Sequence, residues 1–142
     1  MEKQLDRFIE AQDHLHTYDT AIKELRNGHK ESHWMWFIFP QLKGLGSSRV
    51  SEYYGIGSID EARGYLEDPT LGSRLREATL AMLAHEGRSA ESILGETDAL
   101  KFRSSMTLFD LVSPNDIFAE ALQRFFGGRR CEYTVSRWHP TD

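Results

Sequence analysis

Apolar side chains recur along most of this sequence with the period of an α-helix. Tyr18, Ala21 and Leu25 are spaced i, i+3, i+7, as on one face of an amphipathic helix. Comparable spacing predicts further helices over residues 5–12, 59–66, 71–82, 102–109 and 117–125, and shorter helical turns near residues 50–54 and 93–94. Alternating runs of β-branched residues, which are typical of strands, do not occur. We therefore predict a mainly α fold, a single-domain irregular bundle of short helices over residues 1–142, with Trp138 docked on its core.

Capping residues stand where several of these helices are expected to begin. Ser58 followed by Glu61 is a capping box, in which a serine hydroxyl and a glutamate carboxylate satisfy amides at the start of a helix. Thr70 and Asn115 are the expected N-cap residues of the helices that follow them. These signals support the helix starts that the periodicity predicts.

One stretch of the sequence is continuously apolar and shows neither a helical nor a strand period. Residues 34–39 read Trp-Met-Trp-Phe-Ile-Phe, and burying each large side chain stabilises a fold by roughly 2 kcal/mol. We therefore place this stretch at the centre of the core and expect Trp36 and Phe39 to be almost fully buried. Polar residues flank it, His33 before and Gln41 after. Two interpretations stay open: a core segment that ends at a polar corner, or the wall of a ligand pocket.

Polar side chains also interrupt the apolar face of the helix predicted over residues 102–109. Ser104 and Ser105 lie among its apolar positions, and Lys101 directly precedes it. A hydroxyl group on a packed helix face needs a hydrogen-bond partner. That partner is either a carbonyl one turn earlier in the same helix or a group from elsewhere, and both interpretations stay open.

Composition and charge exclude several classes of protein. The 142 residues carry a formal net charge of -5, which disfavours a general nucleic-acid-binding scaffold. Cys131 is the single cysteine, so we expect a free, reduced thiol and neither an internal disulfide nor a multi-thiolate metal site. No apolar run reaches membrane-spanning length, and the first residues lack a secretory signal pattern. These features predict a soluble cytoplasmic protein without a metal or a cofactor, and a homodimer is left open.

Several blocks of the sequence resemble a known bacterial family, domain of unknown function 1810. The main blocks are the stretch from His33 to Gln41, the Gly44-Leu45-Gly46-Ser47-Ser48 segment after it, and the stretch from Ser104 to Phe109. The resemblance covers essentially the whole chain, with the blocks in family order and spacing, and it implies a mostly α-helical fold. Family members are sometimes labelled calpastatin, but nothing in this sequence resembles a disordered calpain inhibitor.

A more distant likeness points to the NADAR (YbiA-like) group, which acts on ADP-ribose-linked metabolites and ADP-ribosylated bases. The Lys101-Phe102 pair is the feature that carries this likeness. The sequence departs from the first family's pattern at Cys131, where that family often has an acidic residue. If that acidic residue caps the last helix in the family, this chain lacks the cap. If the acidic residue takes part in the family's function, that function is in doubt for this chain.

The residues and the resemblance lead to three functional hypotheses. The first is an enzyme or sensor for an ADP-ribose-type nucleotide, an anionic small molecule, with N-glycosidic cleavage as the reaction. The second is a non-catalytic module whose aromatic groove binds a peptide or protein, and the third is a structural or regulatory dimer. A pocket with convergent polar groups would favour the first hypothesis, whereas a flat exposed apolar patch would favour the others.

Under the first hypothesis, charged residues from two segments of the sequence supply the chemistry. Glu61 or Asp98 would act as the general base for cleavage of the N-glycosidic bond. Lys101 is the third catalytic candidate and would hold phosphate together with Arg103, because charged donors make the strongest hydrogen bonds to phosphate oxygens.

The expected ligand-binding residues lie mainly in the two resembling blocks. Trp34 or Trp36 would stack on a base or a ribose. The remaining candidates are polar side chains that would donate hydrogen bonds: His33, Gln41, Ser47, Ser48, Ser104 and Ser105. We predict that His33, Gln41, Lys101, Ser104 and Ser105 converge on one pocket, because burying each polar group without a partner would cost free energy.

Overall fold

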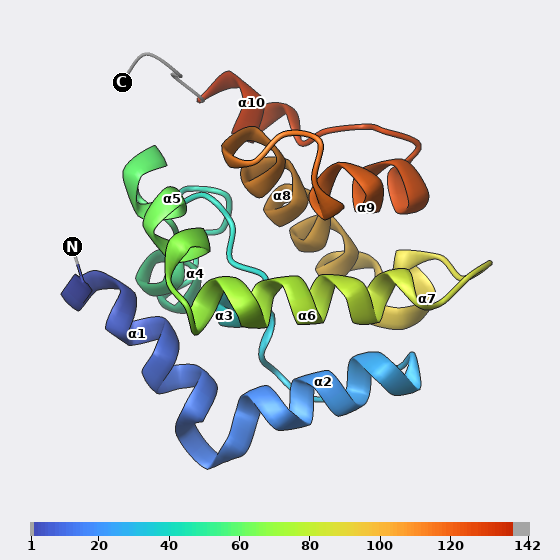
Figure 1. The fold of residues 1–142 in the computed structure, drawn as a ribbon, viewed down its shortest axis with the longest axis horizontal. Coiled ribbons are helices and arrows are strands. Elements are labelled where there is room, and N and C mark those ends of the chain that lie inside the picture. The colour runs from blue at the N-terminus through green and yellow to red at the C-terminus, as the bar shows by residue number, and fades with distance from the viewer. Residues whose placement is uncertain (1, 138–142) are drawn as a thin grey trace.

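The structure is a computed structural model that describes residues 2–137, with side chains described from residue 5 onward; Trp138 lies outside the described residues. Over this range most residues lie in helices, which loops connect (Figure 1). The helices are α1 (Glu2–Asp13), α2 (Thr17–Asn27), α3 (Met35–Ile38), α4 (Arg49–Tyr54), α5 (Ile59–Glu67), α6 (Leu71–Leu83), α7 (Ala90–Leu94), α8 (Glu96–Val112), α9 (Ile117–Phe126) and α10 (Glu132–Ser136), with a 3-10 turn η1 (His14–His16) between α1 and α2. In the described residues, β-type pairing is limited to one parallel bridge between Leu42 and Ile56. The predicted mainly α fold is confirmed.

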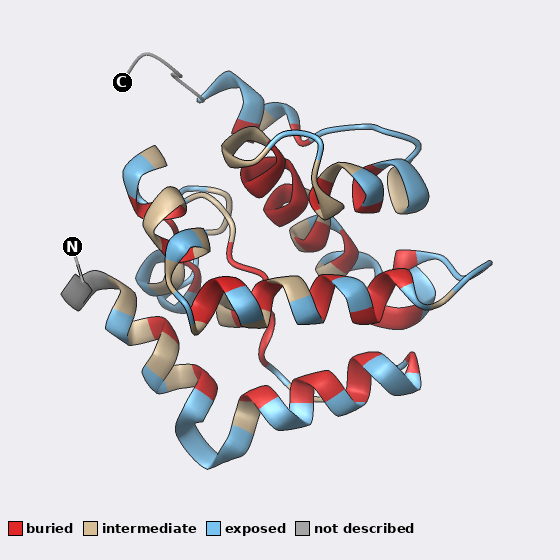
Figure 2. Ribbon diagram, in the orientation of Figure 1, coloured by how far each residue is buried: buried red, intermediate tan, exposed pale blue. Residues whose placement is uncertain are grey.

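Helix α6 crosses the middle of the molecule and packs against α2, α5 and α9 (Figure 1). The long helix α8 packs against α7, α9 and α10. Helices α1 and α2 meet at a sharp angle at η1, where Leu15 and His16 have positive φ angles of 51° and 57°. Buried residues follow the inward faces of the helices (Figure 2). The helices therefore enclose one core in an irregular arrangement.

The continuous apolar stretch lies at the centre of the core, but its two tryptophans differ from the prediction. Trp34 and Phe39 are fully buried, with 0% exposure, whereas Trp36 is only partly buried. The expectation that Trp36 is almost fully buried is therefore wrong. The stretch forms the short helix α3, whose geometry turns Met35 and Ile38 inward together and leaves Trp36 nearer the surface.

Glu24, a buried residue of α2, organises the loop that leads from α2 to Trp34. Its carboxylate accepts hydrogen bonds from the amides of Glu31 (2.9 Å) and Ser32 (3.0 Å) and from the Ser32 hydroxyl (2.6 Å). The indole N–H of Trp34 donates a further bond of 2.9 Å. Burial opposes the charged form of Glu24, but these hydrogen bonds outweigh burial and lower the pKa of the carboxyl to about 2. The ionised carboxylate thus fixes both the loop and the central tryptophan.

Aspartates make the side-chain capping hydrogen bonds at two predicted helix starts. Thr70 stands at the N-cap position of α6, as predicted, but its side chain makes no capping bond, and Asp116 instead of Asn115 is the N-cap residue of α9. The carboxylate of Asp68 accepts hydrogen bonds from the amides of Thr70 and Leu71, both at 2.9 Å, so that the Thr70 side chain does not cap α6. Asn115 adopts a positive φ of 61°, and Asp116 caps α9 instead. A carboxylate is a stronger hydrogen-bond acceptor than a hydroxyl or an amide oxygen, which explains why the aspartates accept the capping hydrogen bonds at both helix starts.

Candidate functional site

Two short segments that are distant in the sequence run side by side ahead of α5. The amide of Lys43 donates to the carbonyl of Ile56 (2.8 Å), and the amide of Ile56 donates to the carbonyl of Gln41 (2.9 Å). Gly55 permits this approach, because a Cβ atom there would lie 2.7 Å from the Cα of Lys43. The pairing holds Lys43 beside the residues that begin α5.

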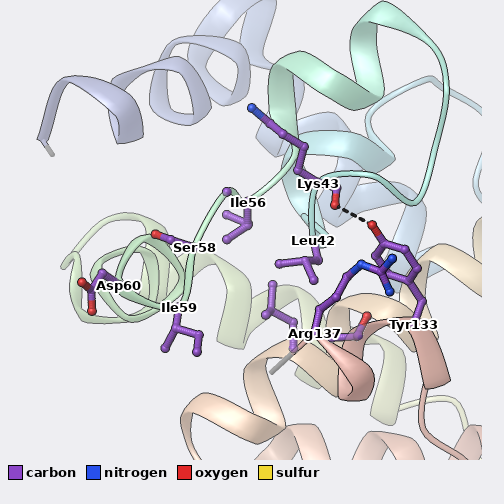
Figure 3. A pocket seen from close by; sticks show the side chains of 11 residues that line it. Leu42, Lys43, Ile56, Ser58, Ile59, Asp60, Tyr133 and Arg137 are labelled. Atoms are coloured by element: carbon purple, nitrogen blue, oxygen red, sulfur yellow. Dashed lines mark hydrogen bonds between the residues drawn. The ribbon is translucent and has the colours of Figure 1, made fainter. Parts of the chain in front are cut away.

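A pocket of about 370 Å³ opens where these segments meet α5, α8 and α10 (Figure 3). We call it the apolar pocket, because aliphatic side chains from several elements line it: Leu42, Ile56, Ile59 and Leu108. Lys43, Gly57, Ser58, Asp60, Tyr133, Thr134 and Arg137 complete the lining. Its volume falls within the range of roughly 300–1,000 Å³ that is typical of small-molecule sites.

Helix α10 supplies the polar wall of the apolar pocket. The hydroxyl of Tyr133 donates to the carbonyl of Lys43 (3.2 Å), and the guanidinium of Arg137 lies 3.6 Å from the centre of the Tyr133 ring (Figure 3). Thr134 is 1% exposed. Its hydroxyl lies beside the Cys131 thiol and makes no hydrogen bond of regular geometry.

A second hollow of about 580 Å³ lies on the other side of Gly57 and Ser58. We call it the polar pocket, because charged and hydroxyl side chains dominate its lining: Arg7, Lys43, Glu52, Tyr53, Ser58 and Glu61, together with Gly57. It shares Lys43, Gly57 and Ser58 with the apolar pocket. We refer to the two hollows together as the α5 cleft, since the start of α5 lies between them.

The start of α5 is built by the predicted capping box. The Ser58 hydroxyl accepts a hydrogen bond from the amide of Glu61 (3.0 Å), as predicted. The Glu61 carboxylate reaches back to the amide of Gly57 (2.8 Å) and pairs with Arg7 (2.8 Å). The remaining first-turn amides of a helix have no intrahelical acceptor, and the helix dipole adds partial positive charge there.

Lys43 and Asp60 carry opposite charges at the α5 cleft. Figure 3 shows the Lys43 side chain extending away from Tyr133 and Arg137, and the Asp60 carboxylate on the far side of α5 from them. Asp60 lies 3.8 Å from Arg63 in an exposed ion pair. The cleft therefore offers the Lys43 ammonium, while the Asp60 carboxylate is directed elsewhere; Glu61, the other carboxylate in the first turn of α5, lines the polar pocket.

Only two of the five residues predicted to converge on one pocket lie together: Gln41 and Lys101 meet beside Trp36 in a third, much smaller hollow. His33, Ser104 and Ser105 do not line this hollow. Trp36, Gln41 and Lys101 are among its lining residues, and its volume is about 10 Å³. The Lys101 ammonium lies 5.1 Å from the centre of the Trp36 ring. A space of this size holds about one water molecule, so the hollow is too small for a nucleotide.

Asp98, predicted as a catalytic base, joins two lysines in a partly buried ion-pair network. Its carboxylate lies 2.9 Å from the ammonium of Lys30 and 3.4 Å from that of Lys101. The Lys30 side chain is 8% exposed; it donates to the carbonyl of Ser32 (2.6 Å) and lies 5.0 Å from the centre of the Trp34 ring. The network thus ties the loop before α3 to α8, which is a structural arrangement.

Replacing Asp98 by asparagine should therefore lower the free energy of unfolding by about 2 kcal/mol, because it leaves the buried Lys30 ammonium without a counter-ion. Urea denaturation would measure the loss. Asp19→Asn, which breaks the exposed pair with His16, is the matched control and should change stability by less than about 0.5 kcal/mol. Equal stability of the two variants would show that the Asp98 network is not structural.

Two hydroxyl groups on the packed face of α8 follow the first interpretation left open above, and a third follows neither. Ser104 donates to the carbonyl of Leu100 (3.1 Å) and Thr107 donates to that of Arg103 (2.8 Å), so both are satisfied within the helix. Ser105 is fully buried, and its hydroxyl has no hydrogen-bond partner among the described residues. The Nε atom of Arg103 is likewise buried without a partner.

The predicted candidates in the surface segments lie apart from these hollows. His33, Ser47 and Ser48 are all exposed. The Ser48 hydroxyl accepts a hydrogen bond from the amide of Ser51 (3.1 Å) and so caps α4. None of these three lines the apolar or the polar pocket.

Cys131 lies at the N-cap position of α10 as a free, buried thiol. Burial raises the pKa of Cys131, but hydrogen bonds from the Ser104 and Thr134 hydroxyls and from the amides of Thr134 and Tyr133 outweigh burial and lower it. An acidic residue at this position would meet the same amides, which is the environment of an N-cap carboxylate.

Sequence reasoning found Glu61 but missed most of the α5 cleft. Lys43, Tyr133, Thr134 and Arg137 line it and were not among the predicted site residues. The capping box was the available signal in the sequence, because it marks a helix start, and helix starts can bind anions. That Lys43 lies beside this helix start could not be read from the sequence. The contribution of α10 had no signal in the sequence.

Two features of the described residues bear on the predicted partners. Within the part of the chain that the structure describes, no group of three or more His, Cys, Asp or Glu side chains is arranged to hold a metal ion. Among the described helices, none has the length and hydropathy needed to cross a bilayer.

These features define a small, mainly helical domain with a cleft at the start of α5. Residues 2–138 match the family described as "Protein of unknown function (DUF1810)", so the chain belongs to this family, as its apolar blocks indicated. The solved structure of the conserved hypothetical protein Rv1873 from Mycobacterium tuberculosis is 46% identical, with a TM-score of 0.89, over 93% of this chain and 94% of that one. No curated protein matches the sequence.

Proposed function

We propose that this protein binds an anionic, ADP-ribose-type nucleotide in the α5 cleft. The observation that carries the proposal is the arrangement of two hollows that share Lys43, Gly57 and Ser58 at the start of a helix. A helix start with a neighbouring lysine favours phosphate groups. A ligand with phosphates in its middle and a different group at each end fits a pair of hollows joined in this way.

The two hollows differ in the chemistry that they offer to the ends of such a ligand. The apolar pocket, with Leu42, Ile56 and Leu108 and the ring of Tyr133, suits a flat base, which buries apolar faces and stacks on aromatic rings. The polar pocket, with Glu52, Ser58 and Glu61, suits a ribose, whose hydroxyls need donors and acceptors.

The contacts of Glu61 favour binding over catalysis. Its Oε1 atom accepts from the Gly57 amide and its Oε2 atom accepts from Arg7. A carboxylate whose two oxygens both accept hydrogen bonds is a weaker general base, because those bonds stabilise its charged form. Asp98 pairs with both Lys30 and Lys101, and neither Asp98 nor Lys101 lines the α5 cleft. We therefore propose a binding protein or sensor in preference to an N-glycosidase.

The test is calorimetric titration of the protein with ADP-ribose, comparing Lys43→Ala with Lys101→Ala. Loss of one charge-assisted phosphate contact should weaken binding about tenfold in the Lys43 variant, whereas the Lys101 variant should bind as the wild type does. Chromatography of the same mixtures would detect any cleavage of the nucleotide. The reverse pattern would place the ligand beside Trp36, and no binding to the wild type would refute the proposal.

A further inference from the structure

Helix α10 is a weakly held wall of the apolar pocket. It has five residues and no side-chain hydrogen bond at its N-cap. Of residues 131–137 only Cys131 and Thr134 are buried, and residues 127–130, which lead into the helix, are all exposed. A helix this short is not stable by itself in water, so α10 depends on its few contacts with the rest of the fold. Segments with few buried contacts open at a lower free energy than the whole protein.

Two contacts with α8 fix the start of α10. The amide of Cys131 donates to the hydroxyl of Thr107 (2.9 Å), and Arg130, the residue before it, pairs with the buried carboxylate of Asp110. Helix α8 is also the helix against which α10 packs most. Both contacts are made by residues that precede the first turn of α10. The start of the helix is therefore anchored, and the turn that follows is free to pivot about it.

A hydrogen bond across the pocket holds the turn that follows. The hydroxyl of Tyr133 donates to the carbonyl of Lys43 (3.2 Å) (Figure 3). Gly44 leaves room for this contact, because a Cβ atom there would lie 2.1 Å from the Tyr133 hydroxyl oxygen. The bond is exposed to solvent, so water competes for both of its groups and its net contribution is small. We call this hydrogen bond the latch of α10.

We propose that α10 is a movable wall: when the Tyr133–Lys43 latch breaks, α10 pivots about Cys131 and admits a ligand to the apolar pocket, and the latch forms again around the bound ligand. The inference rests on the proposed function for the identity of the ligand and adds the step by which it enters. A ligand shifts such an equilibrium only through contacts that differ between the two states. Tyr133 and Arg137, which line the pocket from α10, supply those contacts when the wall is closed.

The thiol of Cys131 serves as the reporter for this movement. It is the single cysteine of the chain, and it is buried at the start of α10, beside the hydroxyl of Ser104 in α8. The experiment measures, by mass spectrometry, the rate at which iodoacetamide alkylates the native protein. Tyr133→Phe keeps the ring but removes the latch, and it should speed alkylation about fivefold, the effect of one net hydrogen bond. An unchanged rate in this variant would overturn the inference.

Two control variants separate the movement of α10 from other causes of alkylation. Tyr53→Phe removes the same hydroxyl group from an exposed tyrosine of α4 and should react at the wild-type rate. Asp98→Asn should lower the stability of the whole fold, as predicted above, without touching α10. If α10 moves by itself, this variant also reacts at the wild-type rate. Faster alkylation in Asp98→Asn, with the wild-type rate in Tyr133→Phe, would show that global unfolding exposes the thiol and would overturn the inference.

Addition of ADP-ribose separates this inference from the proposed function. Saturating ADP-ribose should slow alkylation of the wild type, because the bound ligand favours the closed wall. If calorimetry shows no binding but Tyr133→Phe still reacts faster, the proposed function fails and the movable wall stands. If ADP-ribose binds but Tyr133→Phe and the wild type are alkylated equally fast, the movable wall fails and the proposed function stands. Binding that leaves the alkylation rate unchanged would overturn closure around the ligand.

Discussion

Replacing Trp34 by alanine is expected to lower the free energy of unfolding by about 3–5 kcal/mol. The side chain is fully buried, it lies beneath the Lys30 ammonium, and its indole N–H donates to Glu24. Alanine would leave a large cavity and an unused acceptor on a buried carboxylate. Urea denaturation monitored by far-UV circular dichroism, which does not depend on the lost fluorophore, would measure the change.

Trp36→Ala is the matched control for this prediction. Trp36 is partly buried, and the Lys101 ammonium over its ring is still paired with Asp98 when the ring is removed. We expect a loss of about 1 kcal/mol, which is typical of a side chain that is not fully enclosed. A larger loss for Trp36→Ala than for Trp34→Ala would mean that the core is centred on the other tryptophan.

Glu24→Gln is expected to cost about 3 kcal/mol at neutral pH and to change how stability depends on pH. The pKa of Glu24 is about 2 in the folded protein against an ordinary value of 4.5. Because the pKa of Glu24 is lower in the folded than in the unfolded protein, its carboxylate stabilises the fold at pH values above the unfolded pKa. This stabilisation is lost as the pH falls from about 4.5 toward 2. Glutamine has no charge, and its NH2 group cannot accept the hydrogen bonds that one carboxylate oxygen of Glu24 accepts.

The measurement is the difference in unfolding free energy between the wild type and Glu24→Gln at several pH values from 2.5 to 7, a window that follows from the pKa shift. The difference should be largest above pH 5 and should shrink as the pH falls, because only the wild type loses the charged group. Other carboxylates, such as Asp116, whose pKa is also near 2, titrate in both proteins and cancel. Glu31→Gln, an exposed neighbour, is the control and should follow the wild type. If the difference in unfolding free energy does not vary with pH, the hydrogen bonds do not lower the pKa of Glu24, and the prediction is wrong.

The starts and ends of most helices could be predicted because local interactions decide them. The spacing of apolar residues in α2 and α9 follows the 3.6-residue period, and glycines with positive φ close both helices at Gly28 and Gly127. Ser58 and Ser89 cap α5 and α7 with their own hydroxyls. Thr70 stands at the predicted N-cap position; the error at Asn115 arose because its neighbour Asp116 could equally serve as the N-cap.

The roles within the apolar stretch could not be predicted, because a continuous apolar run has no period from which an inward face can be read. Whether Trp34 or Trp36 is buried depends on the position of Glu24, which lies in another helix and binds the indole of Trp34. Similarly, Asp98 resembled a catalytic carboxylate in the sequence. Its partner Lys30 comes from a distant loop, and only this tertiary contact makes it part of a structural network.

By itself the sequence determined the helical class of this protein, most of its helix boundaries and its family, because period, capping and ordered motifs are properties of short segments. The α5 cleft was decided by tertiary structure alone, since Lys43, Ser58 and Thr134 come from three separate parts of the chain. Thr134 shows the reason most clearly. Which groups surround its side chain, the Cys131 thiol among them, is set by how α8 and α10 pack.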